Sequence, residues 1–208
     1  DGIRDSSVTG VQTCALPIFT FNGDSFAGDN LEIFLGRGPA RLANGALNHL
    51  AVGVLLTGAR IGLVRGAGTT ETFALWATGT VQVLGVEGVT LAGTATVAVN
   101  TTGQVVSRTL TLPGTSTTVS LDFPTAARTT RFEIVGGTLS VLGQSLSGNF
   151  SVGRDGVSGD LVISASAVQA WLGGATSGVG ILGASGTVVV GATGVAASLD
   201  RKSTRLNS

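Results

Sequence analysis

The stretch Thr94-Ala95-Thr96-Val97-Ala98-Val99 decides the fold class, because polar and apolar side chains alternate along it. Successive side chains of a β-strand point to opposite faces of a sheet, so this run predicts a strand with one buried and one solvated face. Its threonines and valines are β-branched, which further favours a strand. The same alternation recurs in five other runs: Thr80–Leu84, Arg108–Leu112, Thr117–Phe123, Thr138–Leu142 and Asn149–Val152.

Turn-forming residues separate these runs. They are Asn100–Gly103, Pro113–Thr115, Gly136–Gly137 and Gly153–Gly156. Glycine supplies the positive φ that tight turns need, and proline stops a strand. Residues 39–45 could form one helical turn, but we interpret them as a loop. The pattern predicts an all-β fold of a dozen or more short strands, in an elongated, repetitive, mostly antiparallel meander or solenoid-like array.

Internal similarity predicts a repeat. Gly79–Gly85 resembles Gly137–Gly143, and Phe34-Leu35-Gly36 resembles Trp171-Leu172-Gly173. Asp24, Phe26, Gly28 and Asp29 also match Asp155, Val157, Gly159 and Asp160 in the same order. Ordered matches favour stacked β units, although a shared Gly/Thr/Val composition is the alternative explanation. We expect one unit at residues 19–165 and the start of a second, truncated unit at residues 166–199.

The DNA that would encode one end of the chain can be written as the reverse complement of the DNA that would encode the other end. One back-translation of residues 200–208 has a reverse complement that encodes Gly-Val-Gln-Thr-Cys-Ala-Leu-Pro-Ile, which is residues 10–18 without a mismatch. This DNA resembles a common short-read sequencing adapter. The resemblance implies that residues 1–18 and 200–208 are adapter-derived and that residues 19–199 are an internal fragment of a longer protein.

Composition narrows the function of residues 19–199. They contain eight arginines, nine acidic residues, no lysine and no cysteine, since Cys14 and Lys202 lie in the adapter-like ends. This balance argues against a nucleic-acid partner, and the missing cysteine excludes a disulfide framework. Glycine and threonine interrupt every apolar run before the ~20 residues of a membrane helix, so no membrane span is expected.

The Thr/Gly/Val-rich repetition over most of residues 19–199 resembles bacterial surface and secreted adhesin-like β proteins. That resemblance implies an extracellular or cell-surface location. We expect a non-enzymatic structural or adhesive segment, with neighbouring repeats of the parent chain, surface glycans or other cells as partners. The alternative is a carbohydrate- or calcium-binding accessory module of a secreted enzyme.

Five oxygen-bearing side chains are candidate calcium ligands: Asp24, Asp29, Asn30, Asp155 and Asp160. Oxygen-rich turns with glycine can bind calcium, and secreted β repeats often use it. The competing interpretation is plain turn chemistry, because aspartate hydrogen-bonds its own backbone. No other cofactor is expected.

No catalytic set is expected. His49 is the single histidine of the chain, whereas triads and zinc sites need several partners. Glu32, Glu71, Glu87 and Glu133 are scattered among predicted strands, and nothing in the sequence brings two of them to one cleft.

Aromatic side chains are expected mainly in the core. Phe34 and Trp171 occupy matched positions, and large residues at equivalent strand positions more often fill a core than bind sugars. Trp76 alternates with Phe73 and Leu75, so it is predicted on the opposite, partly open face.

Overall fold

The computed structural model describes residues 18–67, 71–173 and 177–202, and these form an all-β structure. Ten strands make one antiparallel sheet and two make a separate hairpin. The strands are β1 (Ile18–Asn22), β2 (Ser25–Arg37), β3 (Val52–Arg65), β4 (Phe73–Leu84), β5 (Val89–Asn100), β6 (Val106–Thr111), β7 (Thr118–Phe123), β8 (Thr129–Val141), β9 (Gln144–Arg154), β10 (Leu161–Gly173), β11 (Gly178–Gly191) and β12 (Gly194–Lys202). The predicted all-β, antiparallel architecture is confirmed.

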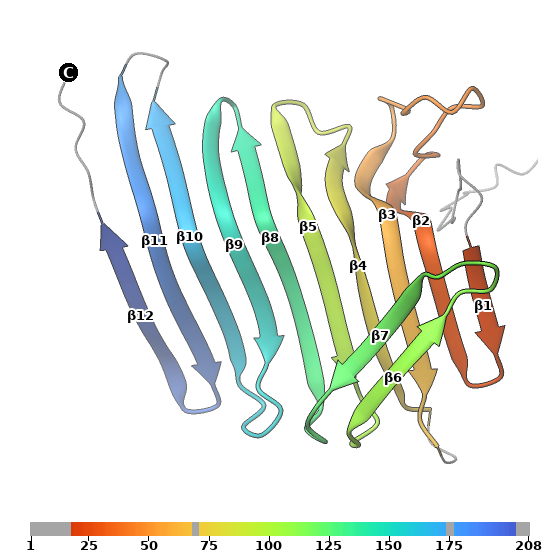
Figure 1. The fold of residues 1–208 in the computed structure, drawn as a ribbon. Coiled ribbons are helices and arrows are strands. Elements are labelled where there is room, and N and C mark those ends of the chain that lie inside the picture. The colour runs from red at the N-terminus through yellow and green to blue at the C-terminus, as the bar shows by residue number, and fades with distance from the viewer. Residues whose placement is uncertain (1–17, 68–70, 174–176, 203–208) are drawn as a thin grey trace, which may run out of the picture.

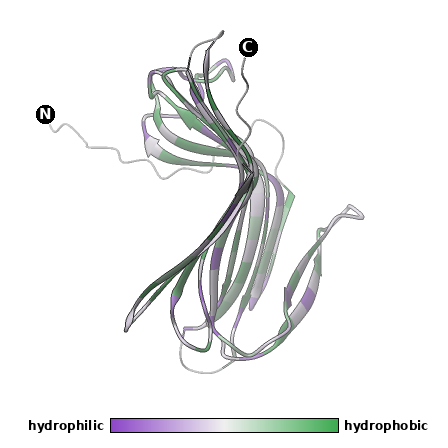
Figure 2. Ribbon diagram, turned by 90° about the vertical axis from the view of Figure 1, so that its left-hand side faces the viewer, coloured by the Kyte–Doolittle hydropathy of each residue, from purple (hydrophilic) through white to green (hydrophobic). Residues whose placement is uncertain are grey.

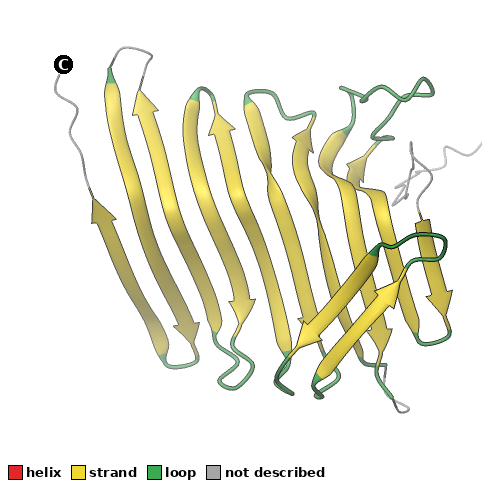
Figure 3. Ribbon diagram, in the orientation of Figure 1, coloured by secondary structure: helices red, strands yellow, loops and turns green. Residues whose placement is uncertain are grey.

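The large sheet is a meander that stays open. Its order is β1-β2-β3-β4-β5-β8-β9-β10-β11-β12, so each strand lies beside its neighbour in sequence except where the β6–β7 hairpin leaves the sheet between β5 and β8 (Figures 1 and 3). β1 and β12 form the two edges. Of the two predicted arrangements, the meander is the one that forms. No membrane-crossing helix occurs in the described part of the chain.

The structure describes only part of the two adapter-like ends. Residues 1–17 and 203–208 lie outside the described residues, whereas Ile18 belongs to β1 and residues 200–202 belong to β12. The boundary predicted between two units, at residues 165 and 166, falls inside β10.

One predicted turn is wrong. Gly136 and Gly137 lie within β8, where the pairing with β9 shifts between Ile134 and Gly137. Gly136 has φ of 61°, so the glycine creates a β-bulge and the strand continues past it. Glycine is favoured at a bulge with positive φ for the same reason as at a turn, so a glycine in the sequence does not distinguish the two.

A row of such bulges crosses the sheet. Five residues with φ between 52° and 65° lie at register shifts between neighbouring strands: Asn30, Gly58, Gly136, Ala167 and Gly183. A bulge bends its strand and increases its twist. Aligned bulges therefore explain why the sheet changes direction at mid-height when seen from its β12 side (Figure 2).

The β6–β7 hairpin packs on one face of the sheet, which we call the front face. Leu121 and Phe123 of the hairpin form a buried cluster with Val64, Ala74 and Ala98, and Trp76 packs against it. Trp76 therefore lies opposite Phe73 and Leu75, on a face that the hairpin covers. Gly62 permits this approach, because a Cβ there would lie 2.8 Å from the side chains of Leu121 and Val119.

A second small cluster lies at the other end of the strands. Phe34 and Leu55 are buried against Ala40 and Ala51 of the β2–β3 loop. Phe34 is thus a core residue as predicted, whereas its match Trp171 is only half-buried. Both clusters involve the early strands, and the buried clusters of the described residues leave β8–β12 without a packed layer.

Truncating Leu121 should destabilise the fold. Leu121 is 0% exposed in the hairpin cluster, so Leu121→Ala is expected to lower the free energy of unfolding by about 2–5 kcal/mol. The matched control is Leu50→Ala at a side chain that is 89% exposed, where the change should stay within about 0.5 kcal/mol. Urea unfolding measures both. Equal losses would contradict the assigned core.

The bulge row predicts opposite effects at two of its positions. A Cβ on Gly58 would meet no atom within 4 Å, so Gly58→Ala tests backbone strain alone and should destabilise by about 1 kcal/mol. Ala167 already carries a Cβ at φ 52°, so Ala167→Gly should be neutral or stabilising by up to about 1 kcal/mol. Thermal and urea unfolding of both variants decide whether the signs differ as expected.

Candidate functional site

Polar side chains line up across the front face of the later strands. Glu133, Ser151, Ser164, Thr187 and Ser198 are consecutive cross-strand partners on β8 to β12, and we call them the hydroxyl row. Ser164 Oγ and Thr187 Oγ1 are 3.1 Å apart and hydrogen-bonded. The antiparallel register thus gathers residues that are far apart in sequence into one line.

A second polar row lies on the same face, closer to the row of bulges. Asn149 pairs with Ser166, and Ser185 pairs with Asp200. Asn149 Oδ1 accepts a hydrogen bond from the Gly136 amide at 2.8 Å, and its Nδ2 donates to Ser166 Oγ at 3.5 Å. The bulge in β8 therefore helps to orient the amide that lines this side.

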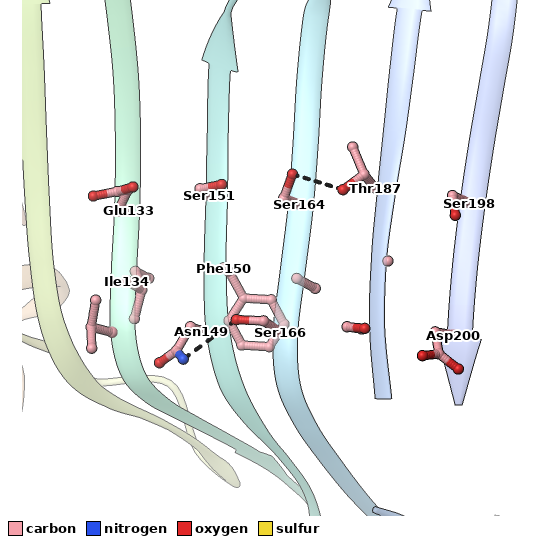
Figure 4. Close-up of a pocket in the computed structure, with 14 residues that line it drawn as sticks. Glu133, Ile134, Asn149, Phe150, Ser151, Ser164, Ser166, Thr187, Ser198 and Asp200 are labelled. Atoms are coloured by element: carbon pink, nitrogen blue, oxygen red, sulfur yellow. Dashed lines mark hydrogen bonds between the residues drawn. The ribbon is translucent and has the colours of Figure 1, made fainter. Parts of the chain in front are cut away.

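Between the two rows runs a groove of about 430 Å³ that crosses the strands (Figure 4). Its floor is the backbone of Ile134, Phe150, Ala165 and Gly186, which are cross-strand partners one position from the hydroxyl row. Because side chains alternate, the floor residues direct theirs to the opposite face. The groove is therefore walled by hydroxyl, amide and carboxylate groups, together with the exposed side chain of Val135 on β8.

The hydroxyl row continues towards β2 beyond the groove. Glu133 pairs with Thr96, and Thr96 Oγ1 lies 3.1 Å from Thr78 Oγ1. Thr78 is the cross-strand partner of Arg60, which binds the Asp29 carboxylate at 3.0 Å. A line of polar partners thus crosses the sheet, charged at its β2 end and mainly neutral in the groove.

Charged side chains lie at the two ends of the groove. Glu133 lies 3.5 Å from Arg131 on the same strand in a half-exposed ion pair, as expected for residues two apart. Asp200 lies at the other end, in the stretch predicted to be adapter-derived. The chemical character of the groove on β9–β11 therefore comes from serine, threonine and asparagine, each of which can donate and accept hydrogen bonds.

The predicted calcium ligands near β2 have other structural roles. Asp29 pairs with Arg60. Asn30 occupies a bulge at φ 56°. The backbone of Asp24 shapes the β1–β2 turn, since its amide donates to the Asn22 carbonyl at 2.6 Å and its carbonyl accepts from the Arg65 amide at 2.7 Å.

The other two calcium candidates shape the β9–β10 turn. Asp155 Oδ1 accepts hydrogen bonds from the Ser158 amide at 2.7 Å and the Val157 amide at 3.0 Å. The Asp160 carbonyl accepts from the Asp155 amide at 2.8 Å. The structure does not bring this turn together with Asp24, because β3, β4, β5 and β8 lie between β2 and β9. The described residues contain no group of three or more His, Cys, Asp or Glu that could hold a metal ion.

The remaining titratable candidates are dispersed. His49 is exposed in the β2–β3 loop, and Glu71 and Glu87 are exposed in the β3–β4 and β4–β5 connections. Glu32 is buried and bound to Arg41, with oxygens 2.6–2.8 Å from the guanidinium nitrogens. Each of these acids thus lies on a different part of the sheet from Glu133.

Comparison of the chain with protein-family models, with curated proteins and with solved structures found no match. The groove therefore has to be interpreted from its own chemistry. Sequence reasoning identified the alternating serines and threonines but not the groove, because its rows appear only once five strands are placed in register.

The β9–β10 turn predicts a pH dependence of stability. Hydrogen bonds from the Ser158 and Val157 amides and the Ser158 hydroxyl lower the pKa of the Asp155 carboxyl. A carboxyl whose pKa is lower in the folded state stabilises the protein above its unfolded-state pKa, and this contribution is lost as the pH falls through the folded-state pKa. Asp155→Ala should therefore unfold at lower urea concentration than the parent at neutral pH, and the difference should vanish in acid.

The control for this turn is Ser158→Ala, which keeps both amide donors to Asp155. It removes the hydroxyl hydrogen bond to Asp155 at 3.1 Å and the one that the hydroxyl accepts from the Asp160 amide at 3.2 Å. Its stability should retain most of the pH-dependent difference. Urea unfolding across a pH series measures both variants. A gap between Asp155→Ala and the parent that persists unchanged at acidic pH would contradict the role given to this carboxylate.

Proposed function

We propose that this chain is a non-enzymatic, adhesive and structural segment of a larger extracellular or cell-surface β protein, and that its front-face groove binds hydroxyl-rich glycans. The observation that carries the proposal is the groove itself, walled by two rows of neutral polar side chains on β9–β11. Sugar hydroxyls both donate and accept hydrogen bonds, as do the serine and threonine hydroxyls that line it.

The shape of the groove favours a linear ligand. It crosses the strands, so its polar groups repeat at the spacing of neighbouring strands, about 4.8 Å. Ser151, Ser164 and Thr187 provide three successive positions of this kind. An extended polysaccharide could meet the same type of group at each strand, whereas a compact ligand would use only a fraction of the row.

Such binding is weak for one copy of the groove. Each neutral hydrogen bond contributes only about 0.5–1.5 kcal/mol net, because the ligand gives up hydrogen bonds to water. Useful affinity then comes from many grooves acting together, and linked sites gain avidity by factors of about 10²–10⁴ without new contacts. This requirement agrees with the expected partners, which are neighbouring repeats of the parent chain and glycans on surfaces or other cells.

A second candidate function is a carbohydrate-binding accessory module of a secreted enzyme. The same groove favours it, since binding a polysaccharide would hold an attached enzyme near its substrate. The two functions differ in what adjoins residues 19–199 in the parent gene. More copies of the sheet are expected for an adhesin, and a catalytic domain is expected for the enzyme.

Binding to insoluble polysaccharides and to a glycan array tests the groove. The variant Ser164→Ala/Thr187→Ala removes two hydroxyls that are hydrogen-bonded to each other at 3.1 Å and should weaken binding by about tenfold. The matched control Thr109→Ala/Ser120→Ala removes a similar pair on the β6–β7 hairpin, 3.4 Å apart, and should bind like the parent.

Three outcomes count against the groove as the binding site. They are no retention of the parent chain on any carbohydrate, an equal loss in both double variants, and undiminished binding by Ser164→Ala/Thr187→Ala. Circular dichroism of each variant verifies that the sheet is retained, so that a loss of binding reports on the hydroxyls.

A further inference from the structure

We infer that the face of the sheet opposite the hairpin, which we call the back face, binds the back face of a second copy of this chain, giving a two-layer β-sandwich homodimer. This inference is independent of glycan binding, which uses the front face. It starts from the alternation that places polar side chains in the groove, since the same alternation places apolar side chains behind it.

One apolar row crosses the back face without interruption. Val97, Phe132, Val152, Ile163, Val188 and Ala197 are consecutive cross-strand partners from β5 to β12. Each is adjacent in sequence to a member of the polar line on the front face. We call these six residues the apolar row.

A second row towards the bulges extends this surface. Ile134, Phe150 and Ala165, which form the groove floor on the front, direct their side chains to the back next to the apolar row. On the other side, Leu161 pairs with Val190 and Val190 with Val195. The back face is thus apolar in two adjacent rows on the later strands and on β10–β12 in the third row, where Arg154 on β9 is the charged partner of Leu161.

This surface is open to solvent in the single chain. Phe132 and Val152 are each 41% exposed and Ile163 is 40% exposed, which is high for large apolar side chains in the middle of a sheet. The β6–β7 hairpin cannot cover them, because it packs with Trp76 and Ala74 on the front face. Exposed apolar area costs about 25 cal/mol per Å² relative to burial, so a covering layer is strongly favoured.

The size and charge of the surface point to a second copy as that layer. Three rows across the six strands β5 and β8–β12, at about 4.8 Å between strands and about 6.8 Å between rows on one face, span roughly 600 Å². Specific interfaces bury about 600–1,000 Å² per partner, so one copy supplies the area of a small dimer interface. The six residues of the apolar row carry no charge, so the centres of two identical faces meet without repulsion. Arg154, the β9 partner of Leu161, lies in the outermost of the three rows, at the margin of this surface.

The geometry of such a dimer is familiar from β-sandwiches. Two sheets pack face to face about 10 Å apart with their inner side chains interdigitated. In a twofold arrangement the same patch serves both partners and the assembly closes at two copies. Association through the unpaired edges of β1 or β12 would instead give open-ended polymers.

The test is sedimentation equilibrium and light scattering of the full chain in reducing buffer, which keeps Cys14 from cross-linking two copies. The parent should be a dimer. Val152→Lys/Ile163→Lys places two charges on the back face and should raise the Kd of the dimer by at least about a hundredfold. The control Ser151→Lys/Ser164→Lys charges the adjacent residues on the front face and should remain dimeric.

A gentler variant covers the case in which lysines disturb the fold. Val152→Thr/Val188→Thr keeps side-chain size but adds hydroxyls to the apolar row, and it should weaken the dimer by about tenfold with an unchanged circular dichroism spectrum. A monomeric parent, an open-ended polymer, or equal effects of the back-face and front-face lysine pairs would overturn the inference. Dimerisation lost only in the back-face variants supports it.

Discussion

The fixed antiparallel register of neighbouring strands is the constraint on which the rest of this structure depends. Packed side-chain clusters support the early strands through the hairpin and the β2–β3 loop, whereas β8–β12 are held mainly by strand-to-strand pairing. A shift of one residue in that pairing would move each side chain of a strand to the other face. The bulges preserve the register, because each one absorbs a single extra residue and the pairing resumes beyond it.

Register also explains why the two faces differ so sharply. Ser164 and Ile163 are adjacent in sequence, yet one joins the hydroxyl row and the other joins the apolar row. Because the same alternation of polar and apolar residues recurs in register on neighbouring strands, it produces one polar and one apolar surface. In a single sheet layer both surfaces are accessible, whereas a packed two-layer sandwich would bury one of them.

The strands could be predicted from the sequence, but the way in which they pair and assemble could not. The alternation in Thr94–Val99 predicted a strand, and β5 contains it. The sequence Gly136-Gly137 predicts a turn but forms a bulge, because only the pairing with the partner strand distinguishes the two. Asp29 and Asp155 looked alike in sequence, but the first pairs with Arg60 and the second caps a turn. The groove could not be predicted, since its walls come from strands whose pairing depends on bulges at Gly136 and Ala167.

Taken together, the two proposed surfaces impose a geometry on adhesion. If the back faces of two copies meet, both front faces point outward, and the two grooves then face in opposite directions. One dimer could then contact two different glycan surfaces but could not place both grooves on the same flat one. Weak hydrogen bonding at each groove would suit this arrangement, because bridging gains strength from the number of dimers rather than from any single contact. Under these two proposals, bridging of two surfaces is therefore expected in preference to retention on a single one.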